Sequence, residues 1–117
     1  MADDGGPPIR SWSCILREVP TEIVRISYSN KVFLMVSQTG KMGTIINVDS
    51  AAEMGDEGPT VEAKTLIGQR NDVAVDVYAR RIFETVCAAE GVPLVLSLAL
   101  LEYSPPNLTA LIAELKR

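Results

Sequence analysis

Two segments of this chain, residues 32–36 and 94–101, are apolar at almost every position, and Ser97 is the single polar residue in either. Successive side chains of a β-strand point to opposite faces of the sheet, so a strand built from such a segment is apolar on both faces. Strands of this kind lie in the middle of a sheet and must be covered on both sides. The chain is therefore expected to fold in layers around a sheet that contains both segments.

The rest of the sequence supplies enough strand-like segments for a sheet of six strands. Val24, Ile26 and Tyr28 alternate with polar residues, which is the period of two that marks a strand with one wetter face. The strands that we expect, in chain order, are residues 13–19, 22–28, 32–36, 44–48, 61–67 and 94–101. Short turns separate the second, third and fourth, so we expect these three to form an antiparallel meander.

Two helices are expected in the C-terminal half. Asn71 or Asp72 can cap the first, because a short polar side chain accepts hydrogen bonds from the N–H groups of a first turn. Pro105 suits the first position of the second helix. The apolar residues at helical spacing are Val75, Tyr78, Ala79, Ile82, Val86 and Ala89 in the first helix, and Leu108, Leu111, Ile112 and Leu115 in the second.

Together these elements predict an α+β fold, in which residues 13–117 form one domain with a six-stranded, mainly antiparallel sheet and both helices on one face. Residues 1–12 are acidic and rich in Gly and Pro, so we expect a flexible tail there. The second face, where Phe33, Met35 and Ile45 would lie, then has no covering layer. We expect the protein to dimerise through that face, with a second copy or a related chain. The alternative is a monomer whose tail and loops cover it.

The segment Thr39-Gly40-Lys41-Met42-Gly43-Thr44 joins two of the expected strands. Glycine reaches positive φ at little steric cost, so two glycines within four residues predict a hairpin turn. A phosphate-binding loop would need Lys-Ser or Lys-Thr directly after its second glycine and a helix beyond it. Neither condition is met here, so a nucleotide site is not expected.

Composition and charge argue against several classes of function. The net charge of −4 and the scatter of the basic residues disfavour nucleic acid as a partner. The longest apolar run, Val92–Leu101, is far shorter than the ~20 residues of a membrane-spanning helix. There is no histidine, which removes the commonest general base, so we expect neither an enzyme nor a cofactor. An unfamiliar carboxylate active site stays open and would require a deep pocket lined by two or more acids. Cys14 and Cys87 are expected to be reduced thiols rather than metal ligands.

Residues 49–59 form the longest segment without a strand or helix pattern. They include Asp49, Glu53, Asp56 and Glu57, and Met54 is their only large apolar residue. We expect a surface loop, and long loops in compact domains are often functional. The segment is either a plain solvated loop or a contact site for a basic partner surface.

Three short motifs resemble those of the proteasome assembly chaperone 3 family. They are Val19-Pro20-Thr21, the turn Gln38-Thr39-Gly40-Lys41-Met42-Gly43-Thr44, and Thr65-Leu66-Ile67-Gly68-Gln69 before a helix. Their spacing and the order of the elements agree with the family from about residue 13 to the end of the chain.

The resemblance implies a eukaryotic, non-catalytic chaperone of the cytoplasm, with the nucleus as a second location. Members of the family pair with a sister, proteasome assembly chaperone 4, or with themselves, and the pair helps α-type subunits to build the proteasome ring by binding near the α5 subunit. The family supplies no catalytic residues and no motif for the ring contacts. In this mechanism Phe33, Met35 and Ile45 would bind the sister chaperone. The loop acids Asp49, Glu53, Asp56 and Glu57, chosen by charge and exposure, would contact an α subunit. The alternative function is a dimeric scaffold, similar to roadblock or longin domains, for small GTPases or trafficking complexes.

Overall fold

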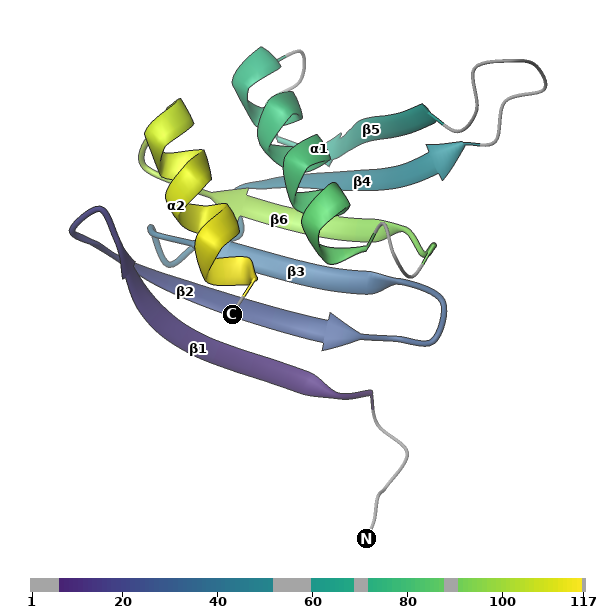
Figure 1. Cartoon of the computed structure of the whole chain (residues 1–117), viewed down its shortest axis with the longest axis horizontal. Helices are drawn as coiled ribbons and strands as arrows, with labels where there is room; N and C mark the ends of the chain where they lie inside the picture. The colour runs from purple at the N-terminus through teal and green to yellow at the C-terminus, as the bar shows by residue number, and fades with distance from the viewer. Residues whose placement is uncertain (1–6, 52–59, 69–71, 88–90, 117) are drawn as a thin grey trace, which may run out of the picture.

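The computed structural model describes residues 7–51, 60–68, 72–87 and 91–116. In these residues six strands form one sheet, and two helices pack on one of its faces (Figure 1). The strands are β1 (Ile9–Leu16), β2 (Val19–Ser27), β3 (Val32–Ser37), β4 (Thr44–Ala51), β5 (Thr60–Ile67) and β6 (Leu94–Ala99). The helices are α1 (Val73–Val86) and α2 (Pro105–Leu115).

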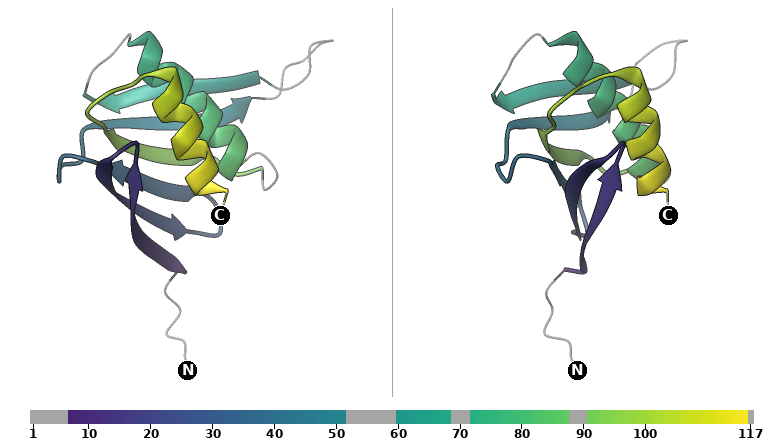
Figure 2. Two further views of the ribbon diagram at one scale, coloured as in Figure 1. Left: turned by 60° about the vertical axis from the view of Figure 1, so that its left-hand side comes forward. Right: turned by 90° about the vertical axis from the view of Figure 1, so that its left-hand side faces the viewer.

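The strands lie in the order β1-β2-β3-β6-β4-β5. β3 and β6, which carry the two segments that are apolar on both faces, are the central pair and run parallel. The other four pairings of this sheet are antiparallel. The predicted α+β class, with a mainly antiparallel six-stranded sheet and helices on one face, is therefore confirmed (Figure 2).

The core lies between the sheet and the helices. Alternate residues of the two central strands point toward the helices and are buried, namely Val32, Leu34, Val36, Leu94, Leu96 and Leu98. From the other side α1 contributes a buried stripe that includes Val75, Tyr78 and Ile82, and α2 contributes Leu108 and Leu111. These residues follow the predicted helical spacing, so the helix faces were assigned correctly from the sequence.

Both helices begin where Asp72 and Pro105 predict. The Asp72 carboxylate accepts hydrogen bonds from the N–H groups of Ala74 and Val75, and the Ser104 hydroxyl accepts one from Asn107. Satisfying these N–H groups fixes the first turn of each helix. Local sequence therefore sets where both helices start.

The connection between β3 and β4 is not the predicted hairpin, and β2, β3 and β4 do not form a meander. β6 lies between β3 and β4, so residues 38–43 cross over the C-terminal end of β6. Gly43 permits this crossing, because its φ is +68° and a Cβ atom there would lie 2.2 Å from the carbonyl oxygen of Leu98. The Ser97 hydroxyl also donates to the carbonyl oxygen of Met42. Glycine is needed at position 43, as the sequence indicated, but it permits a close approach of two main chains rather than a hairpin turn.

Two predicted boundaries are also wrong. β1 begins at Ile9, so the predicted tail of residues 1–12 is too long, and residues 1–6 lie outside the described ranges. β4 continues to Ala51, so Asp49 belongs to a strand and the predicted loop of residues 49–59 starts too early. In both places pairing with a neighbouring strand extends the strand beyond its apolar pattern.

Candidate protein-binding face

The face of the sheet that points away from the helices, which we call the outer face, carries a group of apolar side chains, with Ser97 of β6 between Met35 and Ile45. Phe33 and Met35 of β3 lie in its middle, and the strand register places side chains of β2, β6 and β4 around them. We call six of these residues the apolar centre: Val24, Ile26, Phe33, Met35, Ile45 and Val95. All six are half-buried by their neighbours within the sheet.

No described helix or strand covers the outer face, because both helices lie on the opposite side of the sheet (Figure 2). Among the residues that the structure describes, only the β3–β4 connection reaches it, where Met42 accepts a hydrogen bond from the buried Ser97. The apolar surface continues toward the β1 edge, where Ile9 is 63% exposed and Ile15 is 69% exposed. Fully burying one such side chain is worth about 1.5–3 kcal/mol. Large contiguous apolar patches on soluble proteins mark interaction sites. The outer face is therefore the strongest candidate for a binding site.

Two carboxylates meet at one end of the outer face. Asp49 of β4 lies directly opposite Glu62 of β5, and both side chains are exposed. Like charges at directly opposed positions destabilise a sheet. A basic group from a partner would relieve this repulsion, so this end is suited to contact with a basic surface.

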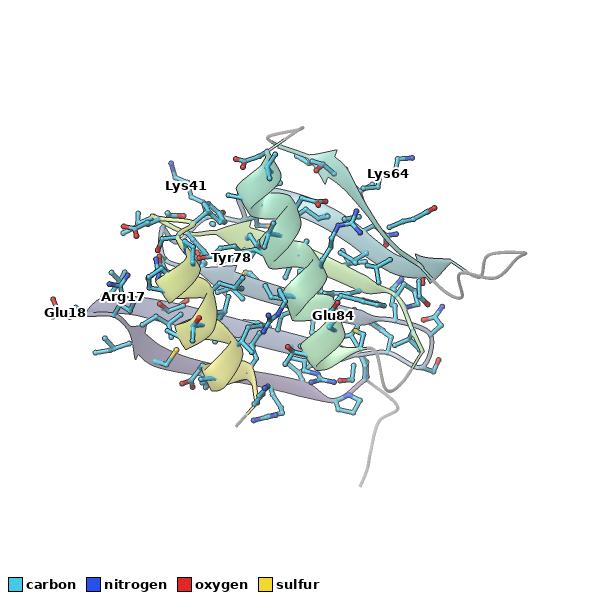
Figure 3. The ribbon with its side chains drawn as sticks, turned by 45° about the horizontal axis from the view of Figure 1, so that its top comes forward. Arg17, Glu18, Lys41, Lys64, Tyr78 and Glu84 are labelled. Carbon is cyan, nitrogen blue, oxygen red and sulfur yellow. The ribbon has the colours of Figure 1, made fainter. Side chains whose placement is uncertain are left out.

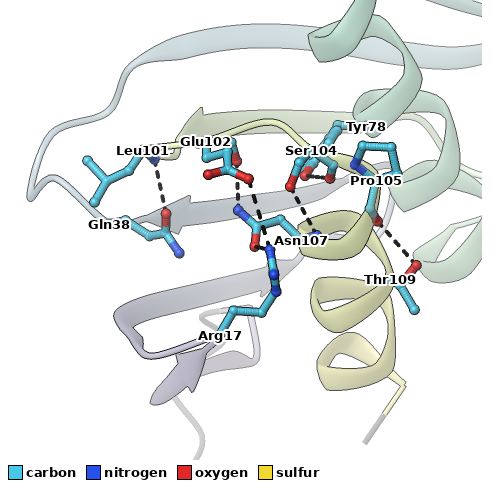
Figure 4. A network of polar contacts seen from close by, with 9 residues as sticks. All are labelled: Arg17, Gln38, Tyr78, Leu101, Glu102, Ser104, Pro105, Asn107 and Thr109. Carbon is cyan, nitrogen blue, oxygen red and sulfur yellow. Dashed lines mark hydrogen bonds and ion pairs between the residues drawn. The ribbon is translucent and has the colours of Figure 1, made fainter.

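Arg17, Glu18 and Lys41 lie at the opposite end of the sheet. Lys64 of β5 lies far from them (Figure 3). Polar contacts tie the connections together at the Arg17 end (Figure 4). The Gln38 amide oxygen accepts a hydrogen bond from the Leu101 N–H at 3.0 Å. The Arg17 guanidinium donates to the Asn107 amide oxygen at 3.2 Å. These contacts link the β1–β2 turn, the β3–β4 connection and the start of α2 into one structural unit.

Tyr78 joins α1 to the start of α2. Its hydroxyl donates to the carbonyl oxygen of Ser104 at 2.5 Å, and its ring packs edge-on against Tyr103 with the centroids 5.1 Å apart. Burial, with smaller contributions from the charge of Glu102 and from Tyr103, raises the pKa of Tyr78 to about 12. The hydroxyl is therefore protonated at neutral pH and acts as a hydrogen-bond donor in the structure.

A hollow between α1 and β5 is lined by two acids, Asp72 and Asp76, which is the residue type that a carboxylate active site requires. Asp72 Oδ1 accepts hydrogen bonds from the N–H groups of Ala74 and Val75 at 3.0 and 3.3 Å. Asp76 Oδ2 lies 2.8 Å from Arg80 Nε. Helix capping and an ion pair one helical turn apart account for both carboxylates without a catalytic role.

Within the described ranges, no three Cys, Asp or Glu side chains are grouped so that they could hold a metal ion. None of the helices in that part of the chain is long and apolar enough to cross a membrane. Cys14 is half-buried and Cys87 is buried, as expected of small apolar side chains.

Of the seven residues predicted to bind partners, Phe33, Met35 and Ile45 are brought together in the apolar centre. Asp49 lies on the same face at its charged end, in a strand rather than in a loop. The remaining three, Glu53, Asp56 and Glu57, lie outside the described residues.

Sequence reasoning did not assign Val24, Ile26 and Val95 to this face as partner-binding residues. Their alternation was visible in the sequence, but the pattern does not say which strands are neighbours. It also missed Glu62, whose position opposite Asp49 depends on the register of β4 and β5.

Comparison with known proteins points to one family. Residues 34–117 match the family model for Proteasome assembly chaperone 3. A protein of that name from Nematostella vectensis is 27% identical over 126 residues, covering 98% of this chain and 92% of that protein. One from Bos taurus is 32% identical over 74 residues, covering 62% of this chain and 60% of that protein. In the second match this chain therefore spans less than two thirds of its relative.

A solved structure shares the fold. It is the "Crystal Structure of a Novel Chaperone Complex for Yeast 20S Proteasome Assembly", and it aligns with a TM-score of 0.74 at 16% identity. The alignment covers 94% of this chain and 99% of that chain. At this level of identity the likeness concerns the arrangement of the sheet and its helices.

Proposed function

This chain belongs to the proteasome assembly chaperone 3 family, and on that premise we propose that it is a non-catalytic chaperone that promotes α-ring formation in the proteasome core particle. It pairs with a sister chaperone through the outer face and binds α subunits with its acidic end. It works in the cytoplasm and the nucleus. The observation that carries this proposal is the apolar centre of the sheet, over which no described helix or strand lies.

The partner at the outer face is proteasome assembly chaperone 4 in a heterodimer. In a homodimer the partner is a second copy of this chain. Two sheets that pack face to face lie about 10 Å apart and interdigitate their inward side chains. The apolar centre supplies such side chains from four adjacent strands, β2, β3, β6 and β4. Covering them removes apolar surface from water, which is the main source of free energy for association of this kind.

A charge in the middle of the outer face tests this pairing. Met35→Lys should abolish copurification with the sister chaperone after co-expression, because the ammonium group would be buried without a partner. Glu84→Lys is the matched control, since Glu84 is exposed on the helix side of the molecule (Figure 3). Circular dichroism should show that both variants are folded. Normal pairing of Met35→Lys would remove the outer face from the mechanism.

The acidic end of the outer face is the proposed contact with α subunits, near the α5 subunit. Asp49 and Glu62 already oppose each other there, and Glu53, Asp56 and Glu57 follow Asp49 in the sequence. Charges at the rim of an interface mainly raise the association rate and select the partner. A basic surface on an α subunit fits this end.

A pull-down from cell extract tests the acidic contact. Changing Asp49, Glu53, Asp56 and Glu57 to Ser should reduce recovery of α subunits and leave pairing with the sister chaperone intact.

The double variant Asp49→Ser and Glu62→Ser should also reduce recovery of α subunits, but by less than the quadruple variant. Its control with the same net charge is Glu18→Ser with Glu84→Ser, two exposed acids elsewhere on the chain. Unchanged recovery would remove the acids from the mechanism. Recovery of small GTPases or adaptors in place of α subunits would favour the scaffold alternative.

A further inference from the structure

The two edges of the sheet are built differently. Along β5, Glu62 and Lys64 are exposed, the register with β4 shifts once, and the Arg80 guanidinium donates to the main-chain oxygen of Val61. Charges, register shifts and covering side chains are the usual ways in which proteins protect an edge strand from further pairing. β1 has no register shift and no proline over its eight residues, and Arg10 is its one charged residue.

The hydrogen bonds of the β1–β2 pair show which residues of β1 face the open edge. Ser27 donates its N–H to the carbonyl oxygen of Pro8 at 3.0 Å, which extends by one pair the register that begins with Ile9 opposite Ile26. Opposed residues in an antiparallel pair alternate between bonded and non-bonded pairs. The even-numbered residues of β1 therefore bond to β2. The odd-numbered residues point their N–H and C=O groups toward the open edge.

These odd-numbered residues are Ile9, Ser11, Ser13 and Ile15, and their order is the same in both directions along the strand. Two copies of β1, aligned antiparallel with Trp12 opposite Trp12, would place Ile9 opposite Ile15 and Ser11 opposite Ser13. Each of these pairs can exchange two main-chain hydrogen bonds. A shift of two residues would place Ile opposite Ser, so the sequence favours this one register.

We propose that β1 of one chain pairs antiparallel with β1 of a second copy, centred on Trp12, so that one sheet runs through both chains. The strand is complementary to itself, and its outward-facing positions carry no charge that would select a charged peptide instead. Ile9 and Ile15, at 63% and 69% exposed, are covered by each other in this arrangement. On the helix side the two Trp12 rings become cross-strand neighbours, a favourable pairing for aromatic residues.

The main-chain groups of this edge are not used by packing on the outer face, so pairing through them does not depend on the proposed function. A pair of chains joined through the outer face keeps its β1 edges open. Two such pairs can therefore join through β1, and the two contacts can be tested one at a time.

Disulfide trapping tests the edge contact and its register. Directly opposed residues lie about 5.5 Å apart at Cα, which a disulfide can bridge. Chains carrying Ser11→Cys are mixed with chains carrying Ser13→Cys and oxidised. A cross-linked dimer is expected in the mixture and not in either sample alone, because the same residue in two copies lies beyond the roughly 7 Å limit for a disulfide. Face-to-face packing cannot give this result, since stacked sheets are about 10 Å apart.

The wild-type chain, which carries Cys14 and Cys87, is oxidised in parallel and should give no such dimer. Absence of the cross-link in the mixture, or equal cross-linking in all samples, would overturn the proposal.

Light scattering after size-exclusion chromatography provides a second measurement. Ser11→Pro removes one N–H group from the open edge and none from the β1–β2 ladder, a position where an edge strand tolerates proline. The assembly joined through β1 should disappear in Ser11→Pro. It should persist in Ser11→Ala. The same mass distribution for the two variants would contradict pairing through β1.

Discussion

The two faces of this sheet are made from the same strands, and the described helices cover only one of them. Leu34 and its neighbour Met35 show the difference: Leu34 is fully buried beneath the helices, while Met35 lies half-buried on the outer face. Both are large apolar residues in a central strand. A strand that is apolar on both faces therefore makes one contact within the chain and leaves its second face available for another chain.

Truncating these two neighbours tests the difference between the faces most directly. Leu34→Ala should lower the free energy of unfolding by about 3–4 kcal/mol, because it leaves a cavity in a packed core. Met35→Ala should cost about 1 kcal/mol or less in dilute solution, where no partner packs on the residue. Urea denaturation at several protein concentrations measures both effects. The cost of Met35→Ala should rise with concentration, because association stabilises the folded chain.

Equal losses for the two variants at every concentration would contradict the difference between the faces. Equal losses would mean that Met35 is as fully packed within a single chain as Leu34.

Which residues belong to each face depends on β6 staying between β3 and β4, and Gly43 permits that arrangement. Gly43→Ala should lower the free energy of unfolding by about 2–3 kcal/mol, because alanine is strained at positive φ and its Cβ would meet the Leu98 oxygen. Gly40 is the matched control, since its φ is +78° and a Cβ atom there would have no neighbour within 4 Å. Gly40→Ala should therefore cost only about 1 kcal/mol. Thermal unfolding of the two variants provides the test, and equal costs would rule out the close crossing.

On the face of the sheet that the helices cover, Tyr78 of α1 holds the start of α2 in place. Tyr78→Phe should cost about 1 kcal/mol at neutral pH, because the Ser104 carbonyl loses its donor. The pKa of Tyr78 is raised from 10.0 to about 12 in the folded chain, so folding favours the protonated hydroxyl. Its contribution is complete below pH 10 and is lost as the pH rises toward 12. The gap in unfolding free energy between wild type and Tyr78→Phe should therefore narrow above pH 10, and a constant gap would contradict this role.

The local features of the fold could be predicted from the sequence because their causes are local. Asp72 and Ser104 start the helices through contacts within the first turn. Alternation along residues 32–36 separates Leu34 from Met35 because the period of a strand is two. For the same reason Phe33 and Met35 could be assigned to one face from the sequence, and the β4 register places Ile45 on that face as predicted.

Features that depend on distant partners could not be predicted. Gly43 suits a hairpin and a close crossing equally well, so the position of β6 was missed. Residues 9–12 and Asp49 are held in strands by β2 and β5 rather than by their own pattern. Val24 and Glu62 join the site only through the order and register of the strands.

The smallest expected effect is that of Glu62→Gln, a variant that tests whether the acidic pair on the outer face lowers stability and also serves binding. Glu62→Gln removes one of two opposed negative charges and should stabilise the folded chain by about 0.2–1 kcal/mol. The gain should shrink at high salt, because exposed charges are screened. Glu84→Gln is the control and should be neutral within about 0.5 kcal/mol, since Glu84 is exposed on α1. Urea titrations at low and high salt measure the difference. If the stabilised Glu62→Gln variant also recovers less α subunit from cell extract, the repulsion between Asp49 and Glu62 is a cost that the chain bears for binding. A stabilised variant with full recovery would leave the acidic pair without that function.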